Sequence, residues 1–176
     1  MNRDLEIAPT NDATPLYEAV VGPRNTGYYL AYFRRADTRG YAPVSWHWPA
    51  FFFGFFWLLY RRQYRWALIF MAVSLTLTAA ASMLLASGAG GWVTPAYYVA
   101  MLAFQMVYVP LQANAIYYGW ARHEVAAAQT AFPGQPRQQA QHLASRGGVL
   151  GNIGLIAAAS FAALMMLSQA LQRFAE

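Results

Sequence analysis

Polar and apolar residues are strongly segregated along this chain of 176 residues. Residues 66–121 contain no Asp, Glu, Lys, Arg or His over 56 positions, and residues 147–172 contain none over 26 positions. A helix crosses the hydrocarbon core of a bilayer in about 20 apolar residues, so both stretches are long enough to span a membrane. The pattern predicts three transmembrane helices, at Trp66–Ser87, Tyr97–Trp120 and Val149–Leu171.

An aromatic stretch precedes the first predicted span. Eleven of the 21 residues in 46–66 are aromatic, a density suited to a membrane interface. Its apolar part, Trp48–Tyr60, would form about 20 Å of helix against roughly 30 Å of hydrocarbon. We therefore expect an interfacial or re-entrant helix, in which Gly54 permits a bend or a close helix contact.

The N-terminal region is predicted to lie outside the membrane core. Tyr29, Tyr32, Phe33 and Ala36 recur at helical spacing, which indicates a short amphipathic helix on the membrane surface, ended near Arg39–Gly40. Before it, three prolines and no hydrophobic periodicity indicate an extended arm without a core of its own.

Composition agrees with a membrane protein, because 11% of the residues are charged against about 25% in a soluble domain. The predicted fold class is an all-α membrane protein with three transmembrane helices, a short aromatic re-entrant or interfacial helix and an amphipathic N-terminal helix. Five regions follow: an extended N-terminal arm (1–27), an amphipathic and aromatic interfacial region (28–65), a two-span hairpin (66–120), a cytoplasmic loop (121–146), and the third span with the C-terminus (147–176).

Arginine placement predicts the orientation. All twelve basic residues are Arg. If the aromatic segment does not cross the membrane, eleven of them lie on one side and Arg173 alone on the other; if it crosses, the split is six to six. The positive-inside tendency favours the first arrangement, with a cytoplasmic N-terminus in the inner membrane.

Two sequence landmarks resemble a known family. The stretch SWHWPAFFFGFFWLLYRRQY (Ser45–Tyr64) is similar to the recurrent aromatic core of the bacterial membrane proteins grouped as domain of unknown function 2628. ANAIYYGWARHE (Ala113–Glu124) resembles the second landmark of that family. This chain has His47 where Asn is usual and Phe55 where Pro is frequent. The resemblance implies a small bacterial inner-membrane protein and supplies no activity.

Catalytic and metal chemistry find no support in the predicted spans. Intramembrane hydrolysis needs ionisable or nucleophilic groups at bilayer depth, and haem needs axial ligands there. The spans carry no charged residue and no His, and the chain has no Cys. The three histidines (His47, His123 and His142) fall outside the spans without zinc-site spacing. We expect no enzyme and no cofactor or metal site.

Neutral polar residues form two short rows within the predicted spans. They either line a path for a small neutral solute or make hydrogen bonds between helices, and we favour the bonds because two short rows cannot enclose a pore. Pro110 should interrupt the second span and free a carbonyl. The rows are Ser74, Thr78 and Ser82 on the first span, and Gln105, Gln112 and Asn114 on the second.

Small residues form a ridge at the third predicted span, with spacing that lets helices approach closely. A small protein with such a docking ridge and no catalytic group is best interpreted as an accessory or assembly subunit of a larger inner-membrane complex. A lipid- or neutral-solute-handling membrane protein is the alternative. The ridge consists of Gly147, Gly151, Gly154, Ala158 and Ala162.

Six arginines flank the aromatic stretch on the predicted cytoplasmic face. Topology alone explains them, and binding of anionic lipid headgroups also fits, at about 1 kcal/mol per charge near the surface. The positive charge is spread along the membrane plane without a folded basic domain, so no nucleic-acid partner is expected. The headgroup candidates are Arg34, Arg35, Arg39, Arg61, Arg62 and Arg65.

Overall fold

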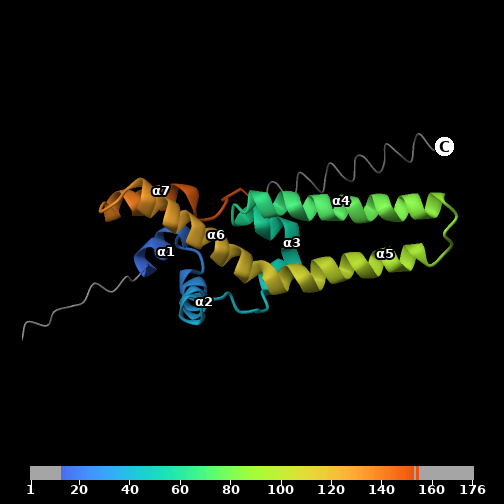
Figure 1. Cartoon of the computed structure of the whole chain (residues 1–176), viewed down its shortest axis with the longest axis horizontal. Coiled ribbons are helices and arrows are strands. Elements are labelled where there is room, and N and C mark those ends of the chain that lie inside the picture. The colour runs from blue at the N-terminus through green and yellow to red at the C-terminus, as the bar shows by residue number, and fades with distance from the viewer. Residues whose placement is uncertain (1–12, 153, 155–176) are drawn as a thin grey trace, which may run out of the picture. The chain divides into compact units, whose positions relative to one another are not determined.

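The computed structural model describes residues 13–152 and residue 154, and every regular element in this part is helical (Figure 1). The described residues fall into two compact units. Unit 1 lies within Met1–Ala42 and Tyr118–Gly148, and unit 2 within Pro43–Tyr117 and Val149–Glu176. The elements are α1 (Thr14–Val21), α2 (Thr26–Arg39), α3 (Trp48–Tyr60), α4 (Tyr64–Ala86), α5 (Val93–Leu102), the π-helical segment η1 (Ala103–Tyr108), α6 (Val109–Ala131) and α7 (Pro136–Arg146).

Unit 1 has an aromatic core. It comprises α1, α2, α7 and the C-terminal part of α6. The ring of Phe33 on α2 lies 5.1 Å from Tyr17 and 5.4 Å from Tyr118, so three helices meet at this side chain. Phe33, Val20 and Leu143 are fully buried. The predicted amphipathic helix is α2, which ends at Arg39 before Gly40.

The expectation of extended chain before residue 28 is wrong for residues 14–21, which form α1. Pro15 stands in the first turn of this helix, where its missing N–H costs no hydrogen bond. Tyr17, Val20 and Val21 then fall at helical spacing and are all buried. A proline interpreted as a breaker therefore begins a helix that belongs to the core of unit 1.

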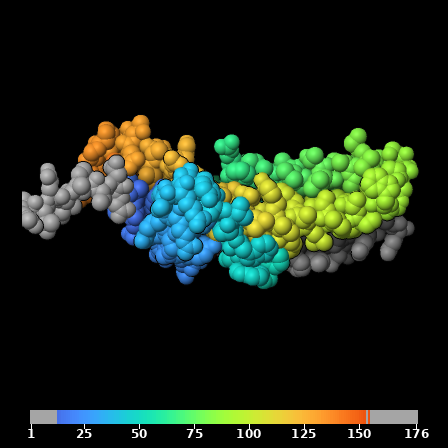
Figure 2. Space-filling model, turned by 60° about the horizontal axis from the view of Figure 1, so that its bottom comes forward, coloured from blue at the N-terminus to red at the C-terminus, as the bar shows by residue number. Residues whose placement is uncertain are grey.

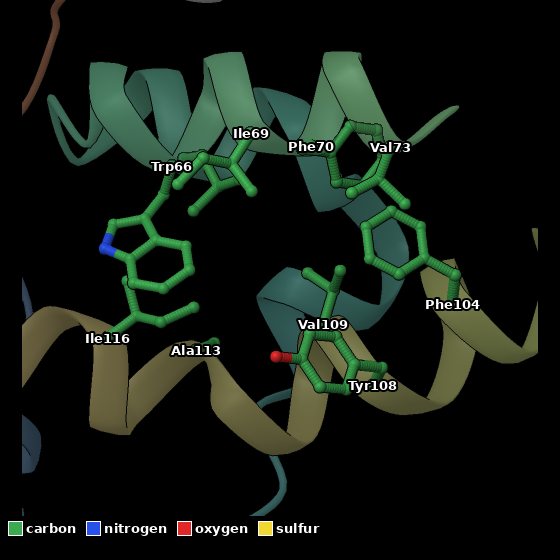
Figure 3. A pocket seen from close by; sticks show the side chains of 10 residues that line it. Trp66, Ile69, Phe70, Val73, Phe104, Tyr108, Val109, Ala113 and Ile116 are labelled. Carbon is green, nitrogen blue, oxygen red and sulfur yellow. The ribbon is translucent and has the colours of Figure 1, made fainter. Parts of the chain in front are cut away.

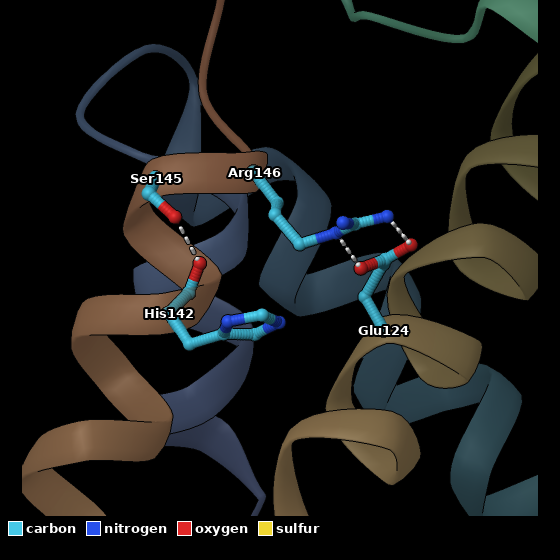
Figure 4. Close-up of polar contacts among 4 residues, drawn as sticks. All are labelled: Glu124, His142, Ser145 and Arg146. Carbon is cyan, nitrogen blue, oxygen red and sulfur yellow. Dashed lines mark hydrogen bonds and ion pairs between the residues drawn. The ribbon is translucent and has the colours of Figure 1, made fainter. Parts of the chain in front are cut away.

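The predicted cytoplasmic loop is helical as well. α6 continues to Ala131, and α7 follows after a short turn. Arg146 of α7 makes an ion pair with Glu124 of α6, through Nε to Oε2 at 2.6 Å and a second contact of 3.3 Å (Figure 4). Glu124 is buried, so the two-point contact compensates a carboxylate removed from water. The segment is part of a folded unit.

In unit 2, α4 and α5 lie side by side (Figure 1 and Figure 2). Two helices are long and apolar enough to cross a membrane: Tyr64–Ala86 with 23 residues, and the continuous helix Val93–Ala131 with 39. The short aromatic helix Trp48–Tyr60 has its predicted bounds. The third predicted span, Val149–Leu171, lies almost wholly outside the described residues.

Two local irregularities shape unit 2. Gly54 interrupts the helical backbone of α3 at φ 40° and ψ −108°, a conformation that side-chain-bearing residues rarely adopt. The interruption expected at Pro110 takes another form. The helix widens into η1 just before it, and the amide of Val109 donates to the carbonyl of Phe104. The wider turn accommodates a proline without ending the helix.

Candidate functional site

The two sequence landmarks meet in unit 2 at a set of buried polar residues, here called the polar cluster: Ser45, His47, Arg61, Gln63 and Asn114. All are buried except Ser45, which is half-buried. Asn114 of α6 donates from Nδ2 to Oγ of Ser45 at 2.8 Å, across 69 positions of sequence. Gln63 donates from Nε2 to the carbonyl of Arg61 at 3.2 Å. The bond from Asn114 to Ser45 therefore joins α6 to the segment that precedes α3.

His47 caps the N-terminus of α3. Its Nδ1 accepts a hydrogen bond from the amide of Ala50 at 3.1 Å, and its ring lies 4.7 Å from that of Trp57. Burial, with a smaller contribution from the charge of Arg61, lowers the pKa of His47 to about 4. The neutral ring is required here because protonation of Nδ1 would remove the acceptor. An Asn at this position would supply a side-chain acceptor that does not titrate.

We expect acid to destabilise the protein through this cap. Below the unfolded pKa of about 6.5 the unfolded chain takes up the proton and the folded chain does not, so stability falls as the pH is lowered toward the folded value. The loss attributable to His47 is about 2 kcal/mol between pH 7 and pH 5.

His47→Asn should abolish that part of the pH dependence of thermal unfolding, measured on the full chain in detergent. His123→Asn, at an exposed position, is the matched control and should leave it unchanged. An unaltered pH profile of the His47→Asn protein would show that the cap does not titrate.

Arg61 departs from the headgroup prediction. Its side chain is 1% exposed, and its guanidinium carbon lies 5.2 Å from the ring centre of Tyr117 and 5.7 Å from that of Tyr60. Trp57 also packs near Tyr117, at 6.5 Å. A desolvated guanidinium over an aromatic face is a stabilising arrangement. Arg61 therefore belongs to the interior of unit 2 and not to its surface.

The other predicted headgroup arginines are distributed over both units. Arg62 is half-buried and has a left-handed φ of 58°. Arg65, in the first turn of α4, is exposed. Three exposed members, Arg34, Arg35 and Arg39, stand on α2 in unit 1.

Within the predicted polar rows, hydrogen bonds are made both between helices and within one helix. Thr78 lies 3.2 Å from the hydroxyl of Tyr97, which joins α4 to α5. Thr78 also donates to the carbonyl of Ser74, and Ser82 donates to that of Thr78, both at 2.9 Å within α4. Gln105 and Gln112 are half-buried on η1 and α6. Asn114 belongs to the polar cluster.

Among the residues of the predicted glycine ridge, Gly147 lies against the backbone of α1 within unit 1. A Cβ built on Gly147 would overlap the carbonyl of Val20, and the amide of Gly148 donates to that same carbonyl at 2.9 Å. This contact joins the end of α7 to α1 inside unit 1. No described atom lies within 4 Å of a Cβ built at Gly151 or Gly154. The remaining members, Ala158 and Ala162, lie outside the described residues.

Asp37 joins three helices of unit 1 and was not singled out from the sequence. Its Oδ1 accepts hydrogen bonds from the hydroxyls of Tyr118 at 2.5 Å and of Tyr17 at 3.4 Å. Burial, followed by the charge of Asp37, raises the pKa of Tyr17 above its ordinary value, so this phenol remains a donor. The partners are 20 and 81 positions away, and no local pattern signals them.

Within the described residues, no group of three or more His, Cys, Asp or Glu side chains is placed to hold a metal ion.

These features define a helical protein with two helices that meet the length and apolarity of membrane spans, and with a set of buried polar residues beside them. The chain belongs to the family described as proteins of unknown function (DUF2628), whose family model matches residues 25–122. No curated protein and no solved structure matches the chain. Every residue of the polar cluster lies within the family region, whereas α1 and α7 lie outside it.

Proposed function

We propose that this protein is a non-catalytic, multi-pass integral membrane protein that serves as an accessory or assembly subunit of a larger bacterial inner-membrane complex. The observation that carries the proposal is the uncovered apolar surface of α4. None of its most apolar window is buried, and Leu75 and Met83 are 63% and 73% exposed. Water disfavours so large an apolar surface, which lipid or another membrane protein would cover.

The accessory role is supported by the presence of a second folded unit in addition to the one that contains most of the apolar helices. Unit 2 contains the first candidate span and residues 93–117 of the second, and the described part of unit 1 is a folded set of helices with its own core. Arg34, Arg35 and Arg39 are exposed on α2 and give unit 1 a charged surface suited to a protein partner or to anionic headgroups. Cytoplasmic placement of this arginine-rich unit would agree with the positive-inside tendency.

The test is extraction followed by purification of the native assembly. The full chain should resist alkaline carbonate, dissolve in mild detergent, and retain a companion protein at fixed stoichiometry by native mass spectrometry. Arg34→Gln with Arg35→Gln should lower the retained companion at least five-fold, because exposed charges steer and fix protein contacts. Arg137→Gln, at an exposed position of α7, is the control and should retain it. Release by carbonate, or a chain that purifies alone, would contradict the proposal.

Handling of a lipid or a neutral solute is the second candidate function, and the apolar groove between α4, η1 and α6 favours its lipid form. Solute flux into liposomes that depends on Gln105 or Gln112, in the absence of any companion protein, would support this second function over the first.

A further inference from the structure

An open apolar groove of about 240 Å³ runs along α4 in unit 2 (Figure 3). One wall comes from α4, the other from η1 and the first part of α6, and Leu58 of α3 contributes to the lining. The wall residues labelled in Figure 3 point into the space between the helices.

Aromatic rings line the groove, and their positions depend on two irregularities of unit 2, the break at Gly54 and the π-helical segment η1. A Cβ on Gly54 would approach the ring of Phe70 at 3.9 Å, so the break in α3 brings its backbone close to this wall. Phe70 lies 5.3 Å from Phe104 of η1, and Phe104 stacks on Tyr108 at 5.8 Å. A π-helical turn shifts the register of such side chains relative to a regular helix, and such turns are frequent at functional sites.

We propose that this groove binds one acyl chain of a membrane phospholipid, with the phosphate of that lipid at Arg65. The lining offers carbon almost throughout, so a polar solute would lose hydrogen bonds to water on entry. The volume is below the roughly 300–1,000 Å³ of usual small-molecule sites, which suits a thin flexible chain better than a compact ligand.

Charge complementarity selects a phospholipid among apolar occupants. Trp66 lines the groove, and the exposed Arg65 precedes it directly in the first turn of α4. An arginine at this end of a candidate span is placed where phosphate lies at a membrane interface, and its guanidinium matches phosphate geometry. From Trp66 the lining continues along α4 through Ile69 to Val73, toward the middle of the span.

The experiment uses the full chain in phosphatidylglycerol vesicles that contain a phospholipid with a diazirine in its acyl chain. After irradiation, the labelled residues are mapped by mass spectrometry. Ile69→Trp and Val73→Trp fill the groove from α4. Leu68→Trp and Ala72→Trp are matched controls at neighbouring, exposed positions. We expect label on groove residues, an at least five-fold loss of that label in the two filled variants, and no loss in the controls.

Arg65→Gln should reduce the groove label at least two-fold, because it removes the phosphate contact. Equal label in filled and control variants, label confined to outward-facing residues, or a cross-link between the groove and residues 155–176 of the same chain would overturn the proposal. The inference rests on the membrane placement proposed above. Carbonate extraction of each variant distinguishes failure of the membrane placement from failure of the acyl-chain proposal. A chain that resists extraction but carries no label in the groove would contradict only the acyl-chain proposal.

Discussion

Replacing Gly147 with alanine is expected to lower the apparent Tm of the full chain by roughly 5–10 °C, from about 2–3 kcal/mol of overpacking. The added Cβ would lie 2.7 Å from the carbonyl carbon and 2.8 Å from the Cα of Val20. That carbonyl also accepts the hydrogen bond of Gly148, at 2.9 Å. The clash is with backbone and not with a flexible side chain, so relief requires α1 to shift away from α7. Circular dichroism in detergent is the measurement.

Gly27→Ala is the matched control for this prediction. Gly27 lies in α2 of the same unit, and a Cβ there meets nothing within 4 Å. Alanine favours the helix over glycine by about 1 kcal/mol, so this variant should keep or slightly raise the Tm. If Gly147→Ala unfolded at the wild-type temperature, α1 would not be held against α7 as described.

Elements specified by local sequence were predictable. The aromatic helix has its predicted bounds, Trp48–Tyr60, because a continuous apolar run that ends at an arginine pair marks this segment locally. α2 likewise follows from apolar residues at helical spacing. Gly54 bends the first of these helices as its position suggested. Two of the predicted spans correspond to helices that are long and apolar enough to cross a membrane.

The tertiary contacts were not predictable from composition or spacing. Arg61 stands between residues that suit a membrane interface, and only the approach of Tyr117 from α6 shows that it is buried. Asn114 was interpreted as one of a row of neutral polar residues on the second span, whereas its hydrogen-bond partner Ser45 lies 69 positions earlier. Charge runs reveal which side of a membrane a segment favours, but they do not reveal which charged side chain a distant helix covers.

The arginines of the aromatic stretch should therefore separate into two functional kinds. Arg61→Gln is expected to lower the apparent Tm of the full chain by roughly 5–10 °C, because it removes a desolvated cation–π contact of about 2 kcal/mol and leaves unfilled volume. Arg61→Lys should recover part of the loss, since it keeps the charge but not the planar group that stacks on a ring. Intrinsic tryptophan fluorescence during heating reports the change, because Trp57 packs near Tyr117.

Arg65→Gln provides the comparison at an exposed position four residues away. It removes the same charge without opening the interior, so it should leave the Tm within about 1 °C, as surface substitutions usually do. The dependence of lipid labelling on anionic lipid should instead be altered in Arg65→Gln and preserved in Arg61→Gln. Raising the phosphatidylglycerol content of the vesicles should strengthen lipid labelling of the wild type and of Arg61→Gln, and should do so much less for Arg65→Gln. If both glutamine variants had the Tm of the wild type, Arg61 would have to face the headgroups, as the sequence alone suggested. If both melted early, the interior of unit 2 would extend to the first turn of α4.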